Sequence, residues 1–293
     1  MLLALKLVLL PGMDGTGNLF SEFVAALPET FEAVTVRYPA ERYLQYSELE
    51  DFVLAACPTS GPFILVAESF STPLALKYAA TNPANLKGVV LCAGFATSPV
   101  RGWRRFLGLL LAPLVFRVPM PSLAAKRWLV GPDAPPSLLT AVRAAISSMQ
   151  PKVLAARLRA VLACDVRADA DRIAVPILYI RAKQDRLVNA SCLEELRRIK
   201  PQMAVVALEG PHLLLQREPR SAVDAIVRFI QSGNPTGGRL IVIGATHRLG
   251  VMTMVSVARI ECGQIWPVDK NVAARSLQAQ HSSTSLNTVA ATL

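Results

Sequence analysis

Three side chains in this sequence have the types and the chain order that nucleophilic catalysis requires. Ser69 follows an apolar run, Phe63 to Ala67, and Asp185 and His212 follow two later apolar runs. A serine hydroxyl becomes an effective nucleophile when a histidine takes its proton and a carboxylate orients that histidine. We therefore interpret Ser69 as a candidate nucleophile, His212 as its general base and Asp185 as the acid that orients the base.

The segment around Ser69 has the features of a nucleophile elbow. An apolar run, the serine and a helix-like stretch follow one another, and a sharp strand-to-helix turn exposes a serine hydroxyl. The turn also puts the backbone N–H of Phe70 at a helix N-terminus, where it can stabilise an oxyanion. Ala67 and Ser71 take the small-residue positions of the G-x-S-x-G pattern, although neither is glycine. We expect Ser71 to be a packing residue, and the alternative for Ser69 is a structural serine at a helix start.

The acid and the base both come just after predicted strands. In an open α/β sheet, ligand chemistry lies beyond the carboxyl ends of the strands, where Asp185 and His212 would meet. The other two histidines, His247 and His281, lie in the C-terminal part of the chain. His212 is therefore the candidate base within the domain, with an ordinary surface histidine as the alternative.

A glycine-rich turn, Leu10 to Gly17, follows the first apolar run of the chain. Such a turn can hold a phosphate, but this one has neither the G-x-G-x-x-G spacing nor the lysine of a P-loop. The alternative is that the backbone N–H of Met13 supplies the second donor of an oxyanion hole. Asp14 is then a turn residue and not a catalytic acid.

Together, these segments resemble the α/β-hydrolase superfamily. The residues that carry the resemblance are Leu10-Pro11-Gly12-Met13-Asp14-Gly15-Thr16-Gly17, Glu68-Ser69-Phe70-Ser71, the Asp185 loop and Gly210-Pro211-His212. The chain order Ser, Asp, His is the one that α/β-hydrolases use. The resemblance covers roughly residues 1 to 231 and is greatest to bacterial carboxylesterases and carrier-protein methyl ester esterases. The chain is also similar to plastid phytyl ester synthases, which are acyltransferases on this fold.

The resemblance implies a serine esterase that hydrolyses carboxylic esters through an acyl-enzyme, with no metal or organic cofactor. Ser69, His212 and Asp185 would form the triad, and the backbone N–H groups of Met13 and Phe70 would form the oxyanion hole. The partner would be a small-molecule ester. Two alternatives stay open, namely an acyltransferase with the same triad and a non-catalytic binding protein on this fold.

The segments that must position these residues alternate between two patterns. Runs rich in Val, Ile and Leu, typical of strands buried on both faces of a parallel sheet, lie at 5–10, 33–38, 63–67, 88–92, 175–181 and 203–208. Apolar residues with helical spacing lie at 19–27, 47–56, 73–80 and 220–231. Ser47 and Glu50 have the spacing of a capping box. The alternation predicts an α/β fold with a doubly wound, mostly parallel sheet.

The alternation stops between Ser98 and Arg172, where helix-forming residues occur without a convincing strand. This predicts an inserted helical cap over about 99–172. Its apolar run, beside Arg104 and Arg105, either lines an acyl pocket or packs as core. In the first case, Leu109 and Leu110 would line the pocket.

The C-terminal part of the chain has a different character. Gly233 to Gly238 is predicted to be a linker, and the residues after it become rich in Ser and Thr. We therefore expect a hydrolase domain over 1–232 and a C-terminal extension of unknown structure over 233–293.

Composition limits the partners and the compartment. The formal net charge is +10, but the basic residues are spread out without interleaved aromatic residues, so nucleic acid is not expected as a partner. A solvated basic surface is the simplest interpretation, with an anionic membrane surface or an acidic carrier protein as alternatives. The five cysteines form no CxxC pair and are odd in number, which favours a reducing, cytoplasmic compartment. No transmembrane helix is predicted.

Overall fold

The structure is a computed structural model that describes residues 5–117, 121–231, 240–242, 258–261 and 264–267. The chain divides into two compact units, residues 1–245 and residues 246–293. Within the second unit, the described residues form an antiparallel pair, β8 (Ala258–Glu261) and β9 (Gln264–Pro267). All the predicted site residues lie in the first unit.

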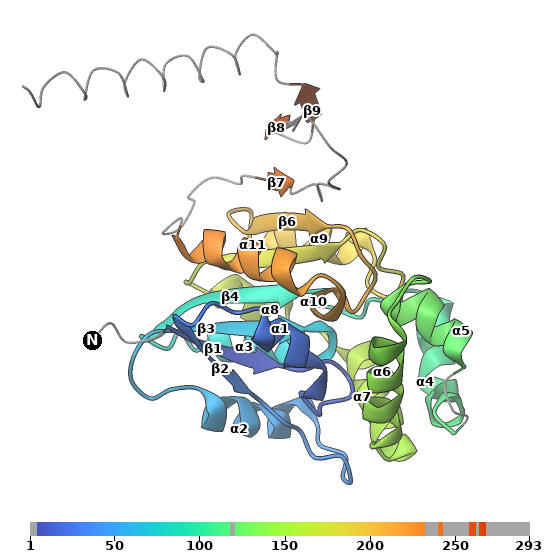
Figure 1. The fold of residues 1–293 in the computed structure, drawn as a ribbon. Helices are drawn as coiled ribbons and strands as arrows, with labels where there is room; N and C mark the ends of the chain where they lie inside the picture. Colours follow the sequence, from blue (N-terminus) through green and yellow to red (C-terminus); the bar gives the residue numbers. More distant parts are fainter. Residues whose placement is uncertain (1–4, 118–120, 232–239, 243–257, 262–263, 268–293) are drawn as a thin grey trace, which may run out of the picture. The chain divides into compact units, whose positions relative to one another are not determined.

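The first unit is built on a sheet of seven strands in the order β2-β1-β3-β4-β5-β6-β7, with every neighbouring pair parallel (Figure 1). The strands are β1 (Leu5–Leu10), β2 (Phe31–Thr35), β3 (Phe63–Glu68), β4 (Leu86–Cys92), β5 (Ile177–Ala182), β6 (Ala204–Leu208) and β7 (Leu240–Val242). All six residues of β3 are buried, as the continuous apolar runs predict for strands that are covered on both faces. The predicted doubly wound α/β fold is confirmed.

Helices cover both faces of the sheet, because successive residues of each strand point to opposite sides. Val8 and Leu10 of β1 pack in the core beneath α2, α3, α8 and α9, whereas Leu7 and Leu9 pack in the core beneath α1, α10 and α11. The bounds of these helices are α1 (Ser21–Ala25), α2 (Tyr46–Ala56), α3 (Thr72–Ala79), α8 (Arg167–Arg172), α9 (Ala190–Ile199), α10 (Leu214–Arg217) and α11 (Pro219–Gln231).

A helical insertion separates β4 from β5. It consists of α4 (Trp103–Val115), α5 (Ser122–Ala125), a π-helical stretch Lys126–Val130, α6 (Pro136–Ser147) and α7 (Pro151–Ala163). The two ends of the insertion meet at an antiparallel bridge between Thr97 and Asp165. The next helix, α8, packs mainly against α3 and α9 on the sheet. The cap is therefore the segment between Thr97 and Asp165. Figure 1 shows it to one side of the sheet.

The structure corrects one local prediction and extends another. The capping box predicted at Ser47 and Glu50 is wrong, because α2 begins at Tyr46 and the carboxylate of Glu48 accepts the backbone N–H of Gln45 at 2.8 Å. Glu50 instead forms an ion pair with Lys77 of α3. Beyond the predicted end of the hydrolase domain, β7 pairs in parallel with β6, while the predicted linker lies outside the described residues. The domain boundary stays a prediction.

Candidate active site

Ser69 lies at a sharp turn between β3 and α3. Its φ angle is 48°, a left-handed conformation that non-glycine residues seldom adopt. The turn is held from the helix side, where the hydroxyl of Thr72 donates to the carbonyl oxygen of Ser69 at 2.8 Å and accepts the backbone N–H of Phe95 at 3.2 Å. Backbone strain of this kind is typical of functional sites. The elbow predicted around Ser69 is thus present in the fold.

The structure brings Ser69, His212 and Asp185 together at the carboxyl ends of β3, β6 and β5. Ser69 Oγ lies 2.9 Å from His212 Nε2, and His212 Nδ1 lies 2.8 Å from Asp185 Oδ2. The other carboxylate oxygen of Asp185 accepts the backbone N–H groups of Leu187 and Val188 at 2.8 and 2.9 Å. These two bonds fix the carboxylate, so that it can fix the imidazole in turn.

The electrostatic surroundings of His212 favour its protonated form. Burial lowers the pKa of the imidazole, but the Asp185 carboxylate, through its charge and its hydrogen bond, and the nearby Glu68 more than offset this, and the net pKa is raised. An imidazolium that forms when His212 accepts a proton is therefore stabilised in place. Such stabilisation is what a general base beside a serine hydroxyl requires.

Glu68, which precedes Ser69, is a buried carboxyl group whose surroundings the sequence did not predict. Burial raises its pKa to about 7, opposed mainly by the charge of His212 and by a hydrogen bond from Gln216. Gln216 Nε2 donates to Glu68 Oε2 at 3.1 Å, while Glu68 Oε1 has no partner in the described residues. No sequence signal identifies such a group, because its ionisation depends on the helix α10 that covers it.

The loop that carries Met13 is tied to the cap by one buried side chain. Arg157 of α7 is 2% exposed, and its Nη1 donates to the carbonyl oxygens of Met13 and Asp14 at 2.8 and 2.9 Å. Its Nη2 donates to the carbonyl oxygen of Pro39 at 2.9 Å. The Met13 carbonyl belongs to the peptide unit that follows the Met13 N–H, so the guanidinium restrains the loop that carries this predicted oxyanion donor.

The position of Arg157 explains one glycine of the glycine-rich turn, Gly15. Its φ angle is 68°, and a Cβ at this position would collide with the guanidinium of Arg157. Asp14 is a turn residue as predicted, since its carboxylate accepts the N–H and the hydroxyl of Thr16 at 2.9 and 2.5 Å. The turn thus fits closely around Arg157, and this explains a glycine there without a phosphate ligand.

Ser71 is more than a small packing residue. It is fully buried, its hydroxyl donates to the carbonyl oxygen of Pro11, and it lies 2.9 Å from the hydroxyl of Tyr38. The turn that carries Ser69 and the loop that carries Met13 are thereby joined directly. Phe70, the second predicted oxyanion donor, stacks on Tyr46, whose hydroxyl donates to the Phe70 carbonyl oxygen at 2.9 Å.

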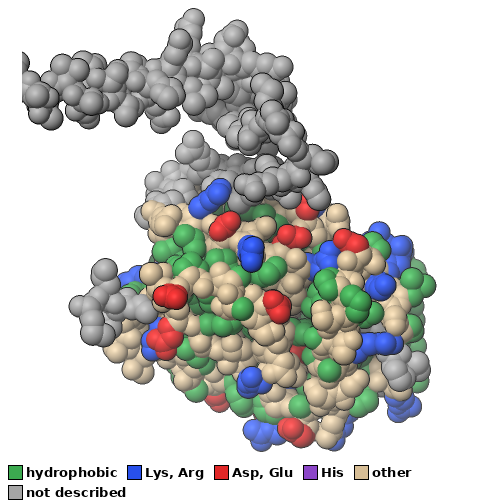
Figure 2. All heavy atoms as spheres, viewed as in Figure 1, with side chains coloured by type: hydrophobic (Ala, Val, Ile, Leu, Met, Phe, Trp, Pro, Cys, Tyr) green, Lys and Arg blue, Asp and Glu red, His purple; other side chains and the backbone are tan. Residues whose placement is uncertain are grey.

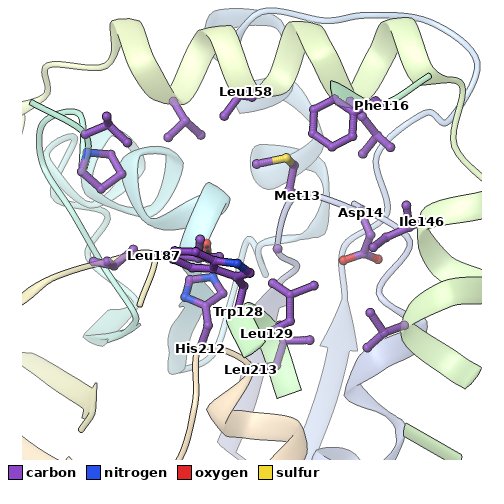
Figure 3. Close-up of a pocket in the computed structure, with 18 of the residues that line it drawn as sticks. Met13, Asp14, Phe116, Trp128, Leu129, Ile146, Leu158, Leu187, His212 and Leu213 are labelled. Atoms are coloured by element: carbon purple, nitrogen blue, oxygen red, sulfur yellow. Dashed lines mark hydrogen bonds between the residues drawn. The ribbon is translucent and has the colours of Figure 1, made fainter. Parts of the chain in front are cut away.

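A cavity of about 340 Å³ opens beside these residues. Figure 3 shows Leu158 of α7 and Phe116 projecting into it from the cap, on the side away from His212. Its lining is almost wholly apolar apart from Asp14, Ser69 and His212, and none of the described residues that line it is a Lys or Arg. Further apolar lining residues are Met13, Leu19, Phe95, Val100, Ala124, Trp128, Leu129, Val142, Ile146, Leu154, Val161, Leu162, Leu187, Val188 and Leu213.

The cap does line the cavity, but not through the residues predicted for this role. Leu110 is 74% exposed on the outer side of α4, and neither Leu109 nor Leu110 lines the cavity. The prediction for these two leucines is wrong, because the phase of α4 is set by its contact with α7 and turns their side of the helix away. Leu158 and Trp128 are among the cap residues that line the cavity instead.

Comparisons with known proteins give the family. Residues 7–226 match the sequence model described as the alpha/beta hydrolase family. The match spans most of the chain, so the protein belongs to the α/β-hydrolase family. A comparison with curated protein sequences gives no match.

The solved structures that share this fold include proteins described as different enzymes. The enol-lactonase from Burkholderia xenovorans is 19% identical with a TM-score of 0.64, and the alignment covers 78% of this chain and 92% of that chain. A thermophilic esterase from Thermogutta terrifontis is 18% identical with a TM-score of 0.65, covering 79% and 91%. A bromoperoxidase from Bacillus anthracis is 17% identical with a TM-score of 0.66, covering 78% and 92%. At these identities the likeness shows the fold alone.

Three further features concern metal ligands, membrane-spanning helices and cysteines. In the described part of the chain, no group of three or more His, Cys, Asp or Glu side chains is arranged to hold a metal ion. No helix among the described residues is long and apolar enough to cross a membrane. Cys57, Cys92, Cys164 and Cys192 are buried free thiols, and Cys262 lies outside the described residues.

Proposed function

We propose that this α/β-hydrolase is a serine esterase that hydrolyses uncharged carboxylic esters. The observation that carries the proposal is the hydrogen-bonded chain Ser69–His212–Asp185, with distances of 2.9 and 2.8 Å, at the edge of an apolar cavity. A serine hydroxyl whose proton can pass to a buried, oriented histidine is equipped for acyl transfer.

In the proposed reaction, Ser69 Oγ attacks the ester carbonyl carbon while His212 Nε2 takes its proton. The C–O bond to the alcohol then breaks, and His212 gives the proton to the leaving alkoxide oxygen. A water molecule, deprotonated by His212, attacks the acyl-enzyme and releases the acid. The backbone N–H groups of Met13 and Phe70 stabilise the tetrahedral oxyanion, each with about 3 kcal/mol.

The cavity supports an apolar, uncharged substrate. Among the described residues that line it, none is a Lys or Arg that could pair with a carboxylate, and Asp14 at its edge would repel an anionic substrate. A volume of about 340 Å³ is near the lower end of the range for small-molecule sites, and it fits a medium-length acyl chain. We therefore propose that the cap side of the cavity binds the acyl chain of the ester.

The closest alternative is acyl transfer to an alcohol with the same triad, and it differs only in which nucleophile attacks the acyl-enzyme. Product analysis with and without added alcohol separates the two, because hydrolysis converts the acyl group to the free acid and transfer converts it to an ester of the added alcohol. A reducing, cytoplasmic compartment is also proposed, and the buried free thiols Cys57, Cys92, Cys164 and Cys192 support it.

A panel of p-nitrophenyl esters with acyl chains of increasing length tests the proposal. We expect turnover to rise with acyl length until the cavity is full and then to fall. Leu158→Trp, which fills the cavity from α7, should move the optimum to shorter chains. The matched control is Leu110→Trp on the exposed side of α4, which should leave the optimum unchanged. A folded enzyme that hydrolyses no ester of the panel would contradict the proposal.

A further inference from the structure

One side of helix α4 exposes large apolar side chains. Trp103, Phe106 and Leu110 are 71%, 75% and 74% exposed, and Leu107 and Leu114 are exposed as well. These five residues recur at intervals of three or four along the helix, so they share one side of it. We call this side the α4 face.

The opposite side of α4 is fully used in packing. Ala112 is completely buried, and a Cβ at Gly108 would lie 2.9 Å from a methyl carbon of Leu162 in α7. A small residue at position 108 therefore lets the two helices approach closely. Rotation of α4 about its axis would break this close contact with α7. The α4 face therefore stays exposed while α4 is packed on α7.

The apolar surface continues beyond α4. Leu123 of α5 is 77% exposed, and Trp128 of the π-helical stretch is 42% exposed. Exposed apolar surface of this extent, carrying aromatic residues, marks an interaction site more often than scattered single residues do.

The segment of the cap that carries this surface is rich in basic residues. Between Pro99 and Pro132 the sequence contains six Lys and Arg residues and no Asp or Glu, and these six are Arg101, Arg104, Arg105, Arg117, Lys126 and Arg127. Arg101 lies 4.0 Å from Glu195, and among the described residues the other five have no carboxylate within ion-pair distance. Figure 2 shows Lys and Arg side chains among hydrophobic ones over the cap helices, on the right of the view.

We propose that the α4 face docks on the surface of a membrane that contains anionic phospholipid. An interfacial helix inserts aromatic and leucine side chains at the boundary of headgroups and acyl chains, while Arg and Lys beside it contact the lipid phosphates. Trp103 and Phe106 fit the first role, and Arg104 and Arg117 fit the second.

Two other occupants lack complementary charge. A second copy of the chain would bring the same basic residues against one another, which is unfavourable. Residues 246–293 contain four Lys or Arg and two Asp or Glu, so this segment does not supply an acidic partner either. A lipid surface provides both features that the α4 face requires, an apolar interior and a layer of negative charge.

The docking surface and the cavity share a residue. Trp128 is part of the exposed apolar surface and also lines the cavity beside Ser69. If the proposed esterase activity holds, an apolar ester dissolved in the lipid could reach the cavity past Trp128. Membrane docking itself does not depend on this step, so it is tested by binding and not by turnover.

Cosedimentation of the full chain with vesicles tests the proposal. One set of vesicles is phosphatidylcholine alone, and the other contains phosphatidylserine as well. We expect binding to the anionic vesicles to be at least about tenfold tighter, and to weaken as salt is raised. Equal binding to both sets, or none to either, would overturn the proposal.

Variants of exposed residues identify the surface. Phe106→Ser with Leu110→Ser should weaken binding to anionic vesicles at least about fivefold, and Arg104→Glu with Arg117→Glu should weaken it similarly. Matched controls are Leu54→Ser on α2 and Arg228→Glu on α11, which change exposed residues away from the cap and should bind like wild type. All variants should hydrolyse soluble esters and melt like wild type.

Two results would assign the surface to another partner and overturn the proposal. In the first, polyglutamate binds as tightly as anionic vesicles, and Phe106→Ser with Leu110→Ser changes neither the affinity for polyglutamate nor the affinity for vesicles. This would indicate a general binding site for acidic protein. The second is a wild-type dimer in solution that these two substitutions dissociate, without any vesicle binding.

Discussion

Arg157 Nη1 in the cap lies 2.8 Å from the backbone carbonyl oxygen of Met13 in the loop after the first strand. A single buried guanidinium therefore connects the cap to the loop that carries a predicted oxyanion donor. Burial lowers the pKa of this guanidinium, and the charge of Asp14 opposes the shift. Arg157 also lies over the rings of Tyr38 and Phe70, at 5.7 and 5.6 Å from their centres.

The first prediction concerns this contact. Arg157→Lys keeps the positive charge but cannot reach three carbonyls with a planar fork of donors, so the Met13 loop should shift. We expect kcat to fall roughly tenfold to a hundredfold, with a smaller change in KM, because misplaced groups act mainly on the transition state. The control is Arg159→Lys, an exposed residue two positions along α7 that should change neither constant. An unchanged kcat in a folded Arg157→Lys enzyme would exclude a positioning role.

The second prediction concerns the charge of Asp185. Asp185→Asn keeps the shape of the side chain but removes the charge that raises the pKa of His212 above its ordinary value of 6.5. We expect kcat/KM to fall by roughly ten-thousandfold. A general base must be neutral, so kcat/KM falls as the pH drops through the pKa of His212. This acidic limb of the pH–activity profile should move to lower pH in the variant. A limb at the wild-type position would mean that Asp185 does not set the pKa of His212.

The third prediction concerns Glu68 and the pH dependence of stability. Its pKa rises from 4.5 to about 7 on folding, so the native state retains a proton that the unfolded chain has lost between these pH values. The free energy of unfolding should therefore decrease as pH rises from 4.5 to 7, by at most about 3 kcal/mol.

Glu68→Gln removes this titration, since an amide stays neutral. Denaturant unfolding at several pH values measures the effect as the difference between the two proteins. We expect the variant to gain stability relative to wild type as the pH rises through this range, and parallel curves for the two proteins would show that Glu68 titrates normally.

The fourth prediction separates the two serines of the elbow. Ser71→Ala leaves the Pro11 carbonyl and the Tyr38 hydroxyl without their buried partner, which should cost about 1–3 kcal/mol of folding stability. Ser71 does not contact the substrate cavity, so acyl-enzyme formation should continue at Ser69. Thermal unfolding and the burst of p-nitrophenol release measure the two effects. A stable but fully inactive Ser71→Ala enzyme would contradict this division of roles.

The strands β1 to β6 and the three residues of the proposed triad were predictable because each depends on local sequence, whereas β7 was not predicted. Continuous apolar runs specify buried parallel strands, and polar residues just beyond two successive runs then meet at one edge of the sheet. Ser69, Asp185 and His212 were predicted in this way. Their hydrogen bonds follow from the topology, although the chain separates Ser69 from His212 by 143 positions.

Contacts between the cap and the sheet were not predictable in the same way. Arg157 has the local sequence of an ordinary helical residue, and its partner Met13 lies 144 positions away. The orientation of Leu110 depends on which side of α4 meets α7, and an apolar run without clear alternation does not specify that side. Both features depend on tertiary packing, so they required the structure.

The most direct test of the central claim is covalent labelling of the nucleophile. Wild type, Ser69→Ala and Ser71→Ala are each treated with a p-nitrophenyl alkyl phosphonate, and the adduct is located by peptide mass spectrometry. The account predicts one phosphonate group on Ser69 in wild type and in Ser71→Ala, and no adduct in a folded Ser69→Ala protein. Labelling that persists in Ser69→Ala, or that is lost only in a folded Ser71→Ala, would contradict it.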